Sequence, residues 1–125
     1  MKLEHSYLIT MSLLILHQID AAYWKEWQMF YIPGGIQVFL LFNIFIIPIV
    51  LIGYKQLVTQ SNTAHFYSYL CASLAILTFL IHCGFALLGT SQFHLPLSIA
   101  IIIFCLIFGI WQVVLTRRLK NSVSV

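Results

Sequence analysis

Residues 36–54 read IQVFLLFNIFIIPIVLIGY, an apolar run without a charged side chain. A helix of about 20 mostly apolar residues spans the roughly 30 Å of hydrocarbon in a bilayer, so this run predicts a transmembrane helix. The rest of the chain agrees, since 62% of its 125 residues are hydrophobic, 7% are charged and the mean hydropathy is +1.00. A soluble domain carries roughly 25% charged residues. The composition therefore predicts an integral membrane protein and excludes a soluble domain.

Three further apolar runs flank residues 36–54. A Pro-Gly-Gly turn at 33–35 precedes that run, a polar connection at 55–65 follows it, and residues 89–94 form another short loop. Four helices are expected, the first of them the least hydrophobic, at residues 7–27, 36–54, 66–88 and 95–116. Short loops make neighbouring helices antiparallel. The predicted fold is a single all-α membrane domain over residues 1–125, a four-transmembrane-helix bundle with up-down-up-down topology.

The distribution of basic side chains predicts the orientation. They gather at the N-terminus, in the connection 55–65 and just beyond the fourth run, and cytoplasmic boundaries of membrane proteins are rich in Lys and Arg. Both termini are therefore expected in the cytoplasm, with an aromatic belt at the outer end of the first helix. The net charge of +3 is small and dispersed, so nucleic acid is not an expected partner. The expected interfacial anchors are Trp24, Trp27, Tyr31, Arg117, Arg118 and Lys120.

Two of the predicted helices carry rows of small and weakly polar residues at helical spacing. Such rows allow close contact between helices inside lipid, so they are expected to face the interior of the bundle. The rows are Cys71, Ala75, Thr78, His82, Ala86 and Gly89 on the third helix, and Ser98, Cys105, Gly109, Gln112 and Thr116 on the fourth.

Some polar residues are expected at membrane depth. An Asp at the centre of a spanning helix costs about 2.5–3.5 kcal/mol on insertion scales, which makes Asp20 a candidate site residue. His17 lies one turn earlier on the same helical face, and the estimated depth of His82 on the third helix overlaps that of Asp20. We therefore predict a buried polar cluster of His17, Asp20 and His82, with Asn43 as the buried polar residue of the second helix.

Four interpretations of this cluster stay open. The polar groups can satisfy one another and fix the register of the helices, or they can relay protons or a solute across the bundle. His17 and His82 can ligate a haem. Imidazole and carboxylate also suit zinc, with candidate ligands His17, Asp20, His82, His94 and Glu26. On an ideal helix, at about 100° per residue, Glu26 points roughly opposite to His17, which weakens its claim as a shared ligand.

The stretch HQIDA at 17–21, followed by Glu26-Trp27, resembles the opening of a family of small bacterial four-span membrane proteins. Its members show His-x-x-(Asp/Glu)-Ala and then Glu-Trp near the end of the first helix, and His82 is similar to a histidine in their third helix. The chain is also similar to proteins with a His-x-x-Glu-Glu signature, from which Asp20-Ala21 departs. The resemblance implies four spans and a bacterial inner (plasma) membrane setting, and it supplies no reaction.

The expected function is that of an accessory or interaction protein in this membrane. Exposed rows of small residues favour helix partners in lipid, so self-association or membership of a membrane complex is expected. The alternatives are a membrane metalloprotein, including a metal-dependent hydrolase, and a proton or solute relay through the same cluster. Whether the protein is an enzyme stays open.

Overall fold

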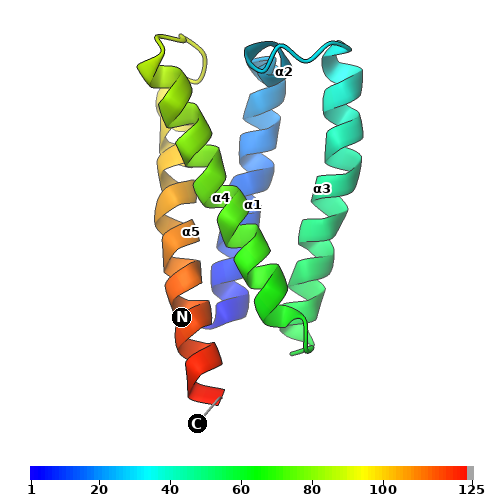
Figure 1. Cartoon of the computed structure of the whole chain (residues 1–125), viewed down its shortest axis with the longest axis vertical. Helices are drawn as coiled ribbons and strands as arrows, with labels where there is room; N and C mark the ends of the chain where they lie inside the picture. Colours follow the sequence, from blue (N-terminus) through cyan, green and yellow to red (C-terminus); the bar gives the residue numbers. More distant parts are fainter. Residues whose placement is uncertain (124–125) are drawn as a thin grey trace.

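The computed structural model describes residues 1–123, and helices make up most of this part of the chain (Figure 1). Long helices run along the long axis of the molecule, and both chain ends lie toward the same end of it (Figure 1). No strand occurs within the described residues. The helices are α1 (Leu3–Tyr23), α2 (Glu26–Met29), α3 (Gly35–Val58), α4 (Ala64–Leu87) and α5 (Pro96–Val123).

Three of the helices, α3, α4 and α5, are each long and apolar enough to cross a membrane. The mean hydropathy of their most apolar segments is 2.6, 2.2 and 2.6, respectively. Their outward faces carry large apolar side chains, such as Phe45 on α3, Leu80 on α4 and Ile107 on α5. A surface of this kind is stable in contact with acyl chains, so the protein is a helical protein with three candidate membrane spans.

α1 buries a stripe of polar side chains among apolar ones such as Tyr7, Met11 and Leu14. Ser6, Thr10 and His17 are buried where α1 packs against α3, α4 and α5, whereas Leu16 and Ile19 are exposed. Residues three and four apart share one face of a helix, so these polar residues form a single stripe. This stripe explains why the first predicted helix is the least hydrophobic.

The predicted inward rows are largely confirmed. Of the row on α4, Cys71, Ala75 and His82 are buried, while Ala86 and Gly89 near its end are exposed. All members of the row on α5 are buried. The two rows pack against each other within the chain, since a Cβ at Gly109 would meet the backbone of Ala72 on α4. Self-association, which these rows led us to expect, stays a prediction.

The helix ends differ from those expected from hydropathy. α3 continues beyond residue 54 and α5 continues beyond residue 116, because the polar residues that follow each apolar run are compatible with a helix outside the hydrocarbon. α1 ends at Tyr23, before the expected end at residue 27. Lys25 has the left-handed backbone conformation (φ 54°), which stops α1 and redirects the chain into the short helix α2.

Candidate metal centre

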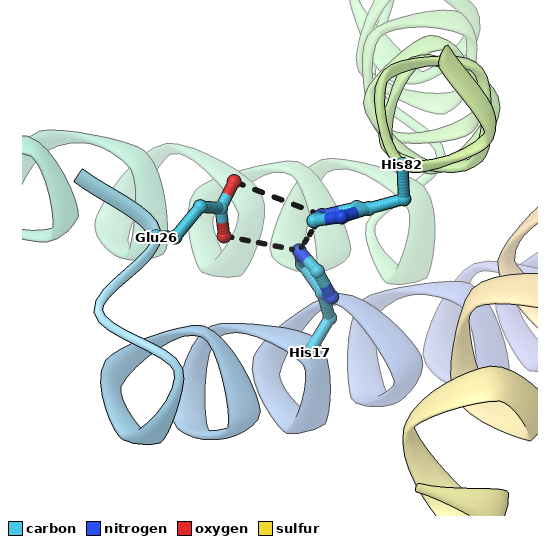
Figure 2. Close-up of side chains that lie close together, drawn as sticks. All are labelled: His17, Glu26 and His82. Carbon is cyan, nitrogen blue, oxygen red and sulfur yellow. Dashed lines mark hydrogen bonds and ion pairs between the residues drawn. The ribbon is translucent and has the colours of Figure 1, made fainter. Parts of the chain in front are cut away.

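Three ligand-bearing side chains meet near the end of α1. The Nε2 atoms of His17 and His82 lie 3.2 Å apart. The carboxylate of Glu26 presents Oε2 to His17 Nε2 at 3.5 Å and Oε1 to His82 Nε2 at 3.7 Å. Figure 2 shows the three side chains pointing toward one another from α1, from the segment after it and from α4. We call these three residues the histidine–glutamate cluster.

The position of Glu26 corrects the expectation that it points away from His17. That expectation assumed one continuous helix through residue 27. Because Lys25 adopts φ 54°, the chain turns back on itself after α1, and Glu26 becomes the first residue of α2. Its side chain then reaches the imidazoles of His17 and His82 (Figure 2). Nothing in the sequence signalled a left-handed lysine at this position.

The separations in the cluster match those of ligands around one metal ion. Zinc binds imidazole nitrogen and carboxylate oxygen at about 2.0–2.2 Å, so the donor atoms of a tetrahedral site lie about 3.4 Å apart. The observed separations of 3.2, 3.5 and 3.7 Å bracket this value. The cluster therefore has the spacing of three corners of a tetrahedron around one ion.

The cluster is withdrawn from the surface. The side chains of His17, His82 and Glu26 are 2%, 5% and 15% exposed, respectively. Among the described residues, Glu26 Oε2 and His17 Nδ1 are buried without a hydrogen-bond partner. An unpaired polar group in an apolar interior is costly, and among the described residues one hydrogen bond, between His17 Nε2 and His82 Nε2, joins the three groups that meet here. This arrangement favours a cation among them.

Phe93, in the loop between α4 and α5, covers one side of the cluster. Its ring centroid lies 4.2 Å from that of His82 and 5.6 Å from that of His17. The residue is buried and has φ 62°, which is unfavourable for a bulky side chain and persists only where packing over-determines it. The sequence does not mark Phe93 as a site residue, because hydropathy places it in a loop and gives no sign that the loop folds inward.

The other side of the cluster faces a cavity of about 440 Å³ between α1, α3 and α4. His17, Glu26 and His82 all line this cavity, and Phe93 does not. Most of the remaining lining is apolar, and Gln18 and Thr78 add polar groups. Ligand sites usually measure roughly 300–1,000 Å³ and combine an apolar wall with a few polar groups. The cavity has both properties.

The other predicted site residues lie outside the cluster. Asp20, one turn after His17, is half-buried, and its Oδ2 has no hydrogen-bond partner among the described residues. Asn43 is buried on α3 and donates from Nδ2 to the carbonyl of Phe39 at 2.9 Å. His94 is exposed, and its Nδ1 lies 2.6 Å from the carbonyl oxygen of Ser91. The structure thus brings together His17, His82 and Glu26 from the candidate ligands.

The predicted aromatic anchors lie around the end of α1, in different surroundings. Trp24 is half-buried and donates from Nε1 to Ser98 Oγ at 3.4 Å. Trp27 is also half-buried and packs against Phe39, with ring centroids 5.5 Å apart, whereas Tyr31 is 93% exposed. The basic anchors Arg117, Arg118 and Lys120 are exposed toward the end of α5.

Comparison with known proteins places the chain in a family and assigns it no activity. No protein with a curated description and no solved structure matches it. A family model matches residues 3–119, nearly the whole chain, including all three residues of the histidine–glutamate cluster. The chain belongs to the family of unknown function DUF6713.

Proposed function

We propose that this protein is an integral membrane metalloprotein that binds one zinc ion through His17, Glu26 and His82. The observation that carries this proposal is the convergence of two imidazole nitrogens and a carboxylate at separations of 3.2–3.7 Å in a buried site. Two histidines and a glutamate are a known zinc ligand set, in which the fourth position stays open to water or substrate. Here that position faces the cavity, because Phe93 covers the opposite side.

The geometry favours zinc over iron in either of its usual settings. Adjacent ligands of an octahedral ion at about 2.1 Å lie about 3.0 Å apart. The separations of 3.5 and 3.7 Å are nearer to the tetrahedral value, and the separation of 3.2 Å lies midway between the two. Haem would need His17 and His82 on opposite faces of the macrocycle, with their nitrogens about 4 Å apart along one axis. Their Nε2 atoms are only 3.2 Å apart.

The membrane arrangement is part of the proposal. α1 is the fourth span of an up-down-up-down bundle, and its inward polar stripe supports this because most of the side chains that lipid would meet, such as Leu8, Leu16 and Ile19, are apolar. The basic residues near both chain ends support cytoplasmic termini in a bacterial inner membrane. The histidine–glutamate cluster then lies toward the outer face, at the end of the bundle away from the termini.

Metal analysis of the detergent-purified protein, prepared without chelator, tests the proposal. We expect about one equivalent of zinc per chain, because all three ligands belong to one chain. Less than a tenth of an equivalent of zinc, after an attempt to reload the protein, would reject it. An absorbance spectrum of the same sample would reveal haem by its Soret band and would favour that cofactor instead.

Two variants separate a specific site from adventitious histidine binding. His82→Ala removes one ligand and should reduce the bound zinc to background. His94→Ala is the matched control, since His94 is an exposed histidine outside the cluster, and it should leave the zinc content unchanged. Equal losses in the two variants would contradict the assignment of the ligands.

A further inference from the structure

The cavity beside the histidine–glutamate cluster opens toward lipid. The most exposed residues that line it are Phe42 on α3 (52%) and Leu77 on α4 (50%), so these two helices form the main mouth; Ile32 and Phe30, ahead of α3, are 44% and 38% exposed. Phe42 and Leu77 belong to helices that are apolar enough to span a membrane. In the view of Figure 1, α3 and α4 are close at the loop that joins them and diverge toward the other end. A molecule that enters through this mouth comes from the acyl-chain region of the bilayer.

The two ends of the cavity differ in chemistry. Side chains such as Ile46, Val50 and Leu74 make its wall apolar, whereas the cluster supplies the polar end. A ligand that fits both must have a hydrocarbon body and a single oxygen-bearing head. A cavity of about 440 Å³ has room for one such chain.

The charge of the site selects the head group. Apart from the two histidines, Glu26 is the only side chain lining the cavity that bears an acidic or basic group, and metal-bound imidazoles are neutral. A zinc ion of charge +2 and this carboxylate of charge −1 leave a net charge of +1. A monoanionic head would neutralise it, and a carboxylate oxygen is an accepted zinc ligand.

We propose that the cavity binds a long-chain fatty acid, whose carboxylate takes the open zinc position and whose hydrocarbon chain lies between α3 and α4. This inference rests on the proposed zinc site. Entry from the bilayer distinguishes it from capture of a water-soluble carboxylate, because the mouth lies among apolar side chains.

Photolabelling in reconstituted vesicles tests the proposal, with palmitate bearing a diazirine on its chain as the probe. Zinc-loaded protein should be labelled on residues of α3 and α4 that line the cavity. Unlabelled palmitate should compete at least tenfold better than hexadecanol, which has the same chain and a neutral head. Equal competition by the two would overturn the inference, because the charged head would then contribute nothing.

Matched variants test whether the probe binds inside the cavity. Ile47→Trp and Ile81→Trp each place a large ring in the cavity wall and should reduce labelling at least tenfold while zinc is retained. Ile44→Trp and Leu80→Trp are the controls, since these residues lie on the same helices, are 63% and 57% exposed, and do not line the cavity. Labelling that survives both cavity variants, in protein shown to hold zinc, would overturn the inference.

Two further measurements distinguish failure of the fatty acid proposal from failure of the zinc proposal, and a free fatty acid from a phospholipid. Zinc is assayed in every labelled sample, so zinc-loaded protein without palmitate labelling rejects the fatty acid and leaves the zinc site standing, whereas failure to bind zinc rejects both. A phosphatidylcholine with the diazirine on an acyl chain is the second probe. If it labels the cavity as efficiently as palmitate does, the occupant is an ester of the bilayer, and the free fatty acid is rejected.

Discussion

Two clusters of polar side chains lie inside the bundle, one near each end of α4, and they contain different functional groups. Near its start, Ser68 meets Gln112 and Thr116 of α5, and we call these three residues the hydroxyl–amide cluster. Near its end, His82 belongs to the histidine–glutamate cluster. Both are buried among apolar helices, so both must satisfy their polar atoms without water.

The hydroxyl–amide cluster satisfies most of its polar groups internally. Gln112 Nε2 donates to the carbonyl of Ser68 at 2.8 Å and to its Oγ at 3.2 Å. The Ser68 hydroxyl can then donate to Thr116 Oγ1 at 2.7 Å, since Thr116 itself donates to the carbonyl of Gln112 at 2.7 Å. Gln112 Oε1 is the exception, because it has no partner among the described residues. Hydroxyl and amide groups each contain a donor and an acceptor, which makes this arrangement possible.

The histidine–glutamate cluster lacks this complementarity. An ionised carboxylate only accepts hydrogen bonds, and a neutral imidazole has one donor for its two nitrogens. Here one hydrogen bond, between His17 Nε2 and His82 Nε2, joins the three groups, and Glu26 Oε2 and His17 Nδ1 have no partner among the described residues. The packing around the two clusters also differs. α5 packs closely against α4 at Gly109, whereas a cavity adjoins the imidazoles of the histidine–glutamate cluster. The comparison separates polar residues that pair with one another across two helices from polar residues that leave acceptors unpaired beside a cavity.

The largest effect is expected from breaking the hydroxyl–amide cluster. Gln112→Ala removes the donor to Ser68 and leaves a void between α4 and α5, which together should destabilise the protein by about 3 kcal/mol. Thermal unfolding in detergent, followed by circular dichroism, measures this change. Ile110→Ala is the control on the same helix, since Ile110 is exposed and its loss should change the stability little. Zinc content should stay near one equivalent in both variants, and its loss in Gln112→Ala would show that the two clusters are coupled.

The next effect is the stabilisation of the protein by zinc. A ligand that binds only the folded state at 100 times its Kd adds about 2.7 kcal/mol to the free energy of unfolding. Adding zinc to metal-stripped protein should therefore raise the melting temperature, and a chelator should reverse the rise. His82→Ala should show no such shift, because one ligand is missing. An equal shift in wild type and variant would mean that zinc acts elsewhere.

A smaller stabilising effect is expected from Glu26→Gln in the absence of metal. The amide supplies a donor to an imidazole nitrogen, and one such hydrogen bond contributes about 1 kcal/mol. The metal-free variant should therefore be more stable than the metal-free wild type by about this amount, while it binds zinc poorly. Glu4→Gln, in the first turn of α1 beside His5, is the control: it should leave zinc binding unchanged and should not raise the stability, because it removes a favourable charge at the start of a helix. A metal-free Glu26→Gln protein that is less stable than wild type would contradict the idea of unpaired acceptors in this cluster.

The buried position of the hydroxyl–amide cluster could be predicted from the sequence, and that of the histidine–glutamate cluster only in part. The inward rows follow from helical periodicity and residue size, so Gln112 and Thr116 could be placed on the buried face of α5 without coordinates. The same argument brought His17 and His82 to the interior. Each of these predictions depends on a residue lying within a regular helix.

Glu26 and Phe93 could not be predicted in this way, because neither lies in a long helix. Each depends on a positive φ, at Lys25 (54°) and at Phe93 itself (62°), and bulky residues rarely adopt that conformation. Tertiary packing stabilises the positive φ of these two residues, so the periodicity of the sequence does not indicate it. The ideal-helix assumption placed Glu26 on the wrong side for this reason.

The smallest effect is expected at Asp20, the residue that the sequence marked most clearly. Its carboxylate lies one turn beyond His17 and outside the histidine–glutamate cluster, and no hydrogen bond joins it to either histidine among the described residues. Residues that orient a metal-bound histidine typically change affinity 10–100-fold when replaced, so Asp20→Asn should stay within about threefold of wild type. Competition with a fluorescent zinc chelator measures this affinity. A loss of tenfold or more would place Asp20 behind His17 Nδ1, the cluster's unpartnered buried nitrogen, as the acceptor that orients the ring.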